Sequence, residues 1–186
     1  MNRDQELWHN ARTLEDLGNL TADWLEGKNS YLPAYGPGDD GVIRPARETA
    51  EIISHLARAN RNGYMTVQSQ PARELRDGFG QRAFVTGYCS KHTASLIQSA
   101  CGDTELIVVA TPPGRGRRHA AAVTIDLGEE FTWAGRSVSR GDRWSSYGRS
   151  CNQAIPALYA AWQATVIDPE WGRRELLWQR LDLAWQ

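Results

Sequence analysis

Residues 82–111, RAFVTGYCSKHTASLIQSACGDTELIVVAT, predict how the chain is organised. They begin with residues 82–88, whose composition predicts a strand. Ser90 then offers an N-cap, and Gly102 a C-cap, for a helix between them. The run over residues 106–111 is short, apolar and β-branched, so it predicts a second buried strand. Strand, helix and strand in this order indicate an α+β or α/β fold.

Further strands are predicted on both sides of this unit. Residues 64–68 precede it as a strand, and residues 73–80 form the crossover that connects them to it. Residues 119–126 alternate in polarity well enough to pair as another strand, and residues 131–134 add an edge. We therefore expect a mixed sheet of about four to five strands.

Helices are predicted at both ends of the chain. Apolar residues recur at steps of three and four over residues 7–25, and Thr13 offers an N-cap at which this helix restarts. A second helix is expected over residues 45–60. Apolar stripes over residues 152–166 and 171–185 predict two C-terminal helices. These N-terminal and C-terminal helices are expected to flank the sheet.

Length and composition predict one globular domain. The chain has 186 residues, of which 41% are hydrophobic and 23% charged, with a net charge of −1. A chain of this size buries enough surface to fold without disulfides or metals, so residues 1–186 are assigned to a single domain. Residues 28–44 are rich in Pro, Gly, Asn and Asp and predict an irregular surface loop. Loops of this length are often functional.

Targeting and ligand-spacing patterns point to a cytoplasmic protein. The N-terminus does not read as a signal peptide, and no apolar run approaches the ~18 residues of a membrane span, so no membrane partner is expected. Cys89, Cys101 and Cys151 have spacings that fit neither a disulfide framework nor a zinc site, and we expect reduced thiols. The histidines are scattered as well. We therefore expect no metal and no cofactor.

Uncharged polar residues gather at the end of the first predicted strand. Thr66, Gln68, Ser69 and Gln70 stand directly before Pro71. Ligands tend to bind at the ends of strands in layered folds, so these four residues are candidate ligand-binding groups. The alternative is that Gln68 and Gln70 satisfy backbone groups in the turn before Pro71.

Arginines are concentrated in a later part of the sequence. Residues 114–150 carry seven arginines and four acidic residues, which suits an anionic partner. Guanidinium groups bind phosphate or carboxylate oxygens, and rings beside them can stack on a base. A solvated hairpin tip is the alternative. The candidates from this region are Arg115, Arg117, Arg118, Arg143 and Trp144.

Cys89 and His92 are the one pair that resembles a nucleophile and its base. A cysteine at a helix N-terminus has its thiolate stabilised by the helix dipole, and His92 follows within one turn. The alternative is that Cys89 packs in the core. The pair has no orienting carboxylate or amide in the sequence pattern, so no catalytic residue is assigned and both stay weak candidates.

Three segments together resemble a known family. They are residues 7–27 (LWHNARTLEDLGNLTADWLEG), 63–71 (GYMTVQSQP) and 81–83 (QRA). They are similar to an uncharacterised domain-of-unknown-function family of high-GC Gram-positive bacteria and their phages. This chain has Ala72 where that family has a glycine. The resemblance implies a shared fold unit and a phage or mobile-element origin, and it implies no particular reaction.

Three functions remain open at this point. The leading hypothesis is a non-catalytic protein that binds a small anionic ligand, above all a nucleotide, as a phage-type accessory or sequestering protein. The first alternative is an interaction module that docks and inhibits a host protein through exposed tryptophans and the loop over residues 28–44. The second is a Cys/His-dependent enzyme. Trp171, Trp178 and Trp185 recur every seven residues and are consistent with core packing or with a homo-oligomer.

Overall fold

The computed structural model describes residues 2–35, 44–116 and 120–186. Among them, seven strands form one open sheet in which every pair is antiparallel. The order is β4-β7-β3-β5-β6, and β1 and β2 also pair with β3. The strands are β1 (Tyr64–Gln70), β2 (Arg73–Arg76), β3 (Phe79–Cys89), β4 (Ile107–Thr111), β5 (Ala121–Asp126), β6 (Glu129–Ala134) and β7 (Trp162–Trp171).

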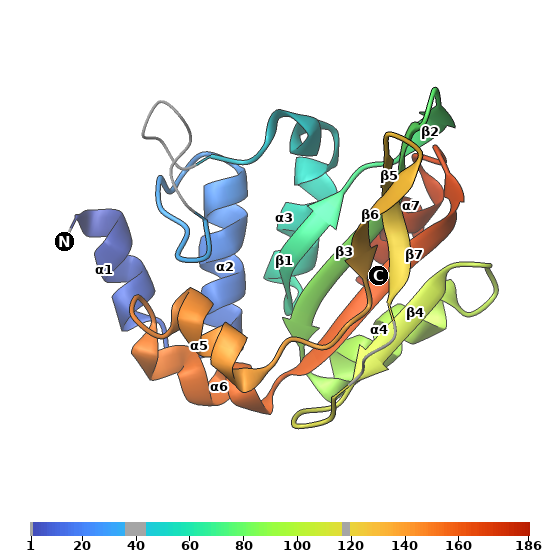
Figure 1. Ribbon diagram of the computed structural model, residues 1–186. Coiled ribbons are helices and arrows are strands. Elements are labelled where there is room, and N and C mark those ends of the chain that lie inside the picture. Colours follow the sequence, from blue (N-terminus) through green and yellow to red (C-terminus); the bar gives the residue numbers. More distant parts are fainter. Residues whose placement is uncertain (1, 36–43, 117–119) are drawn as a thin grey trace.

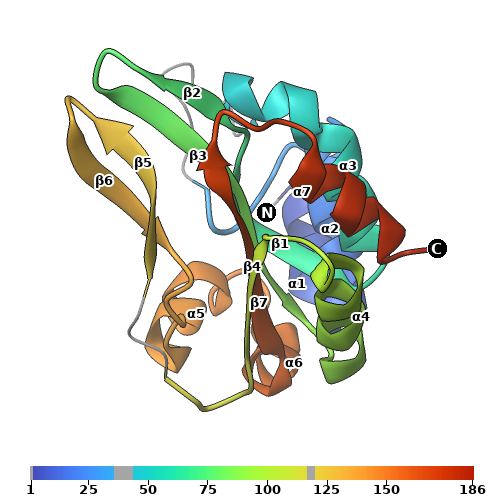
Figure 2. The same cartoon turned by 90° about the vertical axis from the view of Figure 1, so that its right-hand side faces the viewer.

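Helices cover one face of this sheet. Figure 2 shows α2, α3, α4 and α7 on that side, while the β5–β6 hairpin and α5 lie on the other. Figure 1 shows α1 and α2 at the N-terminal end of the molecule, beside α5 and α6. The helical elements are α1 (Arg3–Asn10), α2 (Leu14–Leu25), η1 (Arg47–Ile52), α3 (Ile53–Arg61), α4 (Lys91–Cys101), α5 (Arg140–Tyr147), η2 (Asn152–Ala154), α6 (Ile155–Ala160) and α7 (Leu176–Leu183).

The predicted helix caps are present. The backbone N–H of Asp16 donates to Thr13 Oγ1 at 3.0 Å, and the N–H of Thr13 donates to Asp16 Oδ2 at 2.9 Å, so α2 begins with a capping box. In the same way, Ser90 Oγ accepts from the N–H of Thr93 at 3.0 Å at the start of α4, which ends at Gly102. The restart at Thr13 and the limits of the central helix are therefore confirmed.

Strand β3 is the centre of the sheet. Its C-terminal half pairs with β1 and β7, and its N-terminal half pairs with β2 and β5. Successive side chains of a strand point to opposite faces. Ala83, Val85 and Cys89 accordingly join the main core beneath the helices, whereas Phe84 joins a smaller cluster with Val123 of β5.

The predicted α+β class is confirmed, but the strand arrangement differs from the expectation. The strand, helix and strand over residues 82–111 exist, yet β3 and β4 are not neighbours. Strand β7 lies between them and is antiparallel to both, so a mixed sheet of four to five strands is replaced by seven antiparallel strands. Residues 73–80 are not a crossover, because they form β2 and the turn into β3.

The helix predicted over residues 152–166 is wrong in its second half. Helix α6 ends at Ala160, and Trp162–Trp171 forms β7. The residues Thr165, Val166 and Ile167 are β-branched, and β3 and β4 supply hydrogen-bonding partners on both edges. Tertiary pairing therefore outweighs the helical spacing of the apolar residues.

The final helix is also shorter than predicted. It begins at Leu176 and not at residue 171. Trp171 ends β7, where the guanidinium of Arg82 lies 4.3 Å from its ring centroid. Trp178 is buried. Residues 28–35 contain neither helix nor strand, and residues 36–43 of the predicted loop lie outside the described residues. Within the described parts of the chain, no helix is both long enough and apolar enough to cross a membrane.

Candidate functional site

A groove of about 630 Å³ lies over the helix-free face of the sheet. Its volume is within the range of about 300–1,000 Å³ that is usual for small-molecule sites. Its lining comes from β1, β3, the segment from β6 to residue 138, α5, Gln163 of β7 and residues 34–35. Its lining includes Tyr35, Gln68, Ser69, Thr86, Tyr88, Thr132, Trp133, Arg136, Ser137, Asp142, Ser146, Tyr147 and Gln163.

The floor of the groove comes from alternate residues of β3. Phe84, Thr86 and Tyr88 face the groove, because residues two apart share one side of a strand. Thr86 Oγ1 lies 2.9 Å from Thr165 Oγ1 of β7, and both threonines are buried. Each hydroxyl is therefore the hydrogen-bond partner of the other beneath the groove.

Gln163 of β7 fixes one wall of the groove. Its Oε1 accepts from the backbone N–H of Val138 at 2.8 Å, and its Nε2 donates to the carbonyl of Arg136 at 2.8 Å. Gln163 is only 2% exposed, so these two hydrogen bonds hold the loop after β6 against the sheet. The loop in turn presents the exposed side chain of Arg136 at the groove.

The opposite wall is supported by a buried arginine. Arg143 of α5 donates to the carbonyls of Leu158 and Ala161, and its guanidinium lies 4.3 Å from the ring centroid of Tyr88. Burial lowers the pKa of Arg143. Burial also raises the pKa of Tyr88, and the nearby Arg143 charge partly opposes that shift. Arg143 therefore ties α5 to the end of α6 and positions Tyr88, while its own charge lies away from the groove surface.

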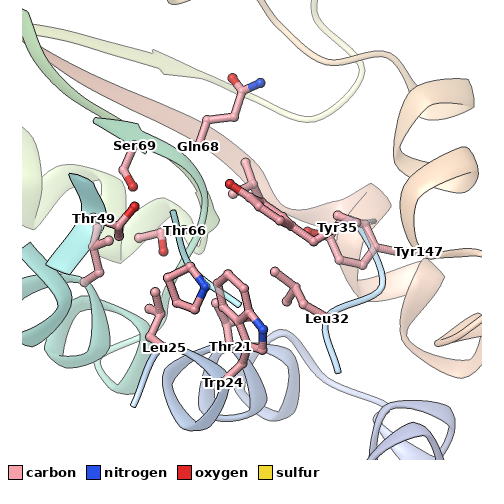
Figure 3. Close-up of a pocket in the computed structure, with 14 residues that line it drawn as sticks. Thr21, Trp24, Leu25, Leu32, Tyr35, Thr49, Thr66, Gln68, Ser69 and Tyr147 are labelled. Atoms are coloured by element: carbon pink, nitrogen blue, oxygen red, sulfur yellow. The ribbon is translucent and has the colours of Figure 1, made fainter. Parts of the chain in front are cut away.

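A small inner chamber of about 50 Å³ adjoins the groove, and both are lined by Tyr35, Gln68, Ser69 and Tyr147. Among the described residues, its lining carries no charged side chain. Figure 3 shows the hydroxyls of Ser69, Thr49 and Thr66 on one side of the chamber, with the Gln68 amide pointing away from them. A cavity of ~150 Å³ is needed for a benzene ring, so this chamber fits a small substituent or about one or two waters.

The polar residues before Pro71 divide into two groups. Gln68 and Ser69 line the groove. Thr66 lines only the inner chamber, and its Oγ1 accepts from Asn60 Nδ2 at 2.7 Å. Gln70 is buried and serves the fold. Its Nε2 donates to the carbonyls of Arg82 and Val123, at 2.9 and 2.8 Å, and its Oε1 accepts from Thr124.

The two described members of the predicted arginine cluster, Arg115 and Arg143, do not line the groove. Arg115 is exposed and does not line it, and Arg117 and Arg118 lie outside the described residues. Arg143 is buried behind Tyr88, and Trp144 is exposed on α5 without lining the groove. The charged residues of the lining are Arg136 and Asp142, and Asp142 accepts from Ser139 Oγ at 2.7 Å. Within the described lining, positive charge therefore comes from Arg136.

Sequence reasoning did not assign Thr86, Tyr88 and Gln163 to the site. The first two could have been found, since the predicted strand over residues 82–88 carries a hydroxyl and a phenol two residues apart. Gln163 could not, because the sequence pattern placed it on a helix.

Cys89 and His92 are not arranged as a nucleophile and base. Cys89 is completely buried on the helix-covered face, and burial raises its pKa to about 12. His92 is exposed on α4. Among the described residues, no group of three or more His, Cys, Asp and Glu side chains is placed to hold a metal ion.

The burial of all three thiols predicts slow modification of the folded protein. Burial raises the pKa of Cys89 and Cys151 to about 12 and that of Cys101 to about 11. The thiolate is the reactive form, so a disulfide reagent at pH 8 should react on the order of a hundredfold more slowly than with the denatured chain. Stopped-flow absorbance measures both rates. Rapid labelling of Cys89 alone in the folded protein would revive the enzyme alternative.

The same pKa shifts predict loss of stability at high pH. In the unfolded chain these thiols have their ordinary pKa of 9.0, whereas burial in the folded chain keeps them protonated until about pH 11–12. The folded state then binds more protons, so the free energy of unfolding falls as the pH rises from 9 to 12. Urea titrations at pH 7 to 10.5 check the slope.

Fold and groove together define an α+β protein with one open antiparallel sheet, covered by helices on one face and hollowed on the other. The chain belongs to the family described as Domain of unknown function (DUF6919), which matches residues 3–185. The predicted resemblance to a family of unknown function is thereby confirmed. No curated protein matches the sequence.

Proposed function

We propose that this chain is a non-catalytic binding protein whose ligand is a small molecule with a planar ring and one anionic group, with a mononucleotide as the first candidate. The observation that carries the proposal is the groove of about 630 Å³, whose described lining combines the exposed residues Trp133, Tyr35 and Gln68 with one arginine, Arg136. Apolar rings with a few polar groups are typical of small-molecule sites.

Each part of such a ligand has a matching group in the lining. Aromatic side chains stack on bases, and Trp133 is 50% exposed at the groove. The Arg136 guanidinium suits a phosphate, because its N–H donors form charge-assisted hydrogen bonds to phosphate oxygens. Gln68 supplies an amide donor and acceptor for a base edge or a sugar hydroxyl. The inner chamber is too small for a ring, so the base lies in the outer groove.

The position of Arg136 favours one phosphate over a polyphosphate. Its loop is held by the two hydrogen bonds of Gln163, so the guanidinium is presented from a fixed backbone. The carboxylate of Asp142 also belongs to the lining. A second or third phosphate would meet this negative charge, and the described lining has no further arginine to offset it.

A thermal-shift screen of nucleosides and of mono-, cyclic and triphosphates tests the proposal. A ligand at 100 times its dissociation constant stabilises by about 2.7 kcal/mol, which should raise the melting temperature by about 5–10 °C. In isothermal titration calorimetry, Arg136→Ala should weaken a mononucleotide about 10- to 100-fold and leave the nucleoside nearly unchanged.

Arg115→Ala is the matched control, because it removes an exposed arginine that does not line the groove. It should leave affinity within about twofold of the unchanged protein. No stabilisation by any compound in the screen, or equal weakening by the two arginine variants, would contradict the proposal.

A further inference from the structure

The inner chamber beside the groove is lined by more hydroxyl groups than the fold itself uses. Two of these hydroxyls bond to neighbouring groups of the protein. Thr21 Oγ1 donates to the carbonyl of Leu17 at 2.8 Å, and Thr66 Oγ1 accepts from Asn60 Nδ2 at 2.7 Å. These two threonines therefore have a structural use for their hydroxyls.

Three other hydroxyls of this lining have no hydrogen-bond partner among the described residues. They belong to Thr49, Ser69 and Tyr147. Thr49 is 9% exposed and Tyr147 is 4% exposed, and buried polar groups normally have a partner. Burial raises the pKa of Tyr147, so its hydroxyl stays protonated and neutral. The chamber thus offers uncharged donors and acceptors to a group that enters it.

A β-bulge places Thr66 and Ser69 on the same side of β1. The two residues are three apart, so on a regular strand they would face opposite sides. The pairing with β3 shifts between Thr66 and Gln68, where two steps along β1 match one step along β3. Figure 3 accordingly shows both hydroxyls on one side of the chamber and the Gln68 amide pointing away. Bulges are frequent beside functional sites, where they redirect a side chain.

The chamber restricts its occupant by size and by charge. Its volume of about 50 Å³ admits a group of about one to three non-hydrogen atoms. Leu25, Leu32 and Leu56 supply apolar walls, and the described lining has no charged side chain. A carboxylate or an ammonium group would lose its hydration here without gaining an opposite charge. The lining therefore suits a short, uncharged group that forms hydrogen bonds.

We propose that the chamber is a specificity subsite that takes a neutral hydrogen-bonding substituent of the groove ligand, such as a primary carboxamide or a hydroxymethyl group. Tyr35, Ser69 and Tyr147 line both the chamber and the groove, so a ring in the groove can extend a substituent into the chamber. A carboxamide donates through its nitrogen and accepts through its oxygen, which matches the hydroxyls of Thr49 and Ser69. The inference rests on the proposed function for the ring and the phosphate that accompany this substituent.

Formamide and formate test the chamber without a nucleotide. The two molecules have nearly the same size and shape, but formamide is neutral and formate is an anion. In NMR titrations, formamide should shift the methyl signals of Thr49, Thr66 and Leu32, with a dissociation constant on the order of 10–100 mM for so small a probe. Formate should bind at least about tenfold more weakly, because its charge would be buried without a partner.

Variants of the chamber hydroxyls test which groups hold the probe. Thr49→Val and Ser69→Ala should each weaken formamide binding about 3- to 10-fold, because each removes a hydroxyl and changes the volume little. Thr21→Val is the matched control, since it makes the same change at a chamber hydroxyl that already donates to the carbonyl of Leu17. It should keep formamide affinity within about twofold. Circular dichroism melts establish that each variant is folded.

Nicotinamide mononucleotide and nicotinate mononucleotide test the subsite together with the groove. Both carry a planar ring and one phosphate, and they differ only in having a carboxamide or a carboxylate on the ring. Isothermal titration calorimetry should show that nicotinamide mononucleotide binds at least about tenfold more tightly. Thr49→Val and Ser69→Ala should reduce this preference, and Thr21→Val should preserve it.

The two experiments separate this inference from the proposed function. If formamide binds in the chamber and neither mononucleotide binds, the subsite is supported and the mononucleotide is the wrong ligand. Absence of formamide binding, equal binding of formamide and formate, or unchanged formamide affinity in Thr49→Val and Ser69→Ala would overturn the inference. Equal affinity for the two mononucleotides would overturn it as well, while leaving the groove as their binding site.

Discussion

Replacing Asp168 by alanine is expected to lower the free energy of unfolding by about 3 kcal/mol. Asp168 is completely buried near the end of β7. Its Oδ2 accepts from Arg173 Nε at 2.8 Å, its Oδ1 accepts from Arg173 Nη2 at 2.6 Å, and Oδ1 also accepts from the N–H of Glu170 at 2.9 Å. Removing the carboxylate takes away the buried acceptor of two Arg173 N–H groups and of the Glu170 backbone N–H.

The expected loss lies at the low end of the ~3–5 kcal/mol that is usual for breaking a buried ion pair. Arg173 keeps its contacts with Glu105 and with Glu170, the latter at 2.9 Å, and its own side chain is 23% exposed. Urea denaturation measures the free energy, and the melting temperature should fall by about 6–12 °C for a chain of this length.

Glu105→Gln is the matched control for Asp168→Ala. Glu105 binds the same guanidinium, but its side chain is 58% exposed, so its loss should cost less than about 1 kcal/mol. If both variants lost the same free energy of unfolding, burial would not determine how much each carboxylate contributes to stability.

Replacing Gln70 by alanine is expected to cost about 3 kcal/mol and to leave any groove ligand bound. The change removes one amide that serves two backbone carbonyls and the hydroxyl of Thr124, all in the interior between β1, β3 and β5. Each polar group left buried without a partner costs about 1–3 kcal/mol. Chemical denaturation and ligand titration of the same sample measure both effects.

Gln68→Ala provides the opposite pattern. Gln68 is on the same strand two residues earlier, but it is exposed and lines the groove. Its replacement should change stability by no more than about 0.5 kcal/mol. Under the proposed function it should weaken ligand binding. If Gln70→Ala left stability unchanged, the assignment of Gln70 to the fold would be wrong.

Of the residues predicted for the site, Gln68 and Ser69 line the groove, and the described arginines Arg115 and Arg143 do not. Gln68 and Ser69 were identified because polar residues at the end of a buried strand often meet a ligand. The arginines were assigned by composition, which says how many guanidinium groups a segment has but not which face they occupy. Arg143 shows the difference, because tertiary packing buries it against Tyr88 and the carbonyls of Leu158 and Ala161.

The sequence alone determined the α+β class, the capped starts of α2 and α4, and the strands β1, β3 and β4. These depend on caps and on periodicity, which act over a few neighbouring residues. Only the tertiary structure decided that Trp162–Trp171 is a strand between β3 and β4, and that Gln163 fixes the groove wall. Strand pairing depends on partners far away in the sequence. Residues 162–171 pair with β3 on one side and β4 on the other, and this pairing outweighs the helical spacing of their apolar residues.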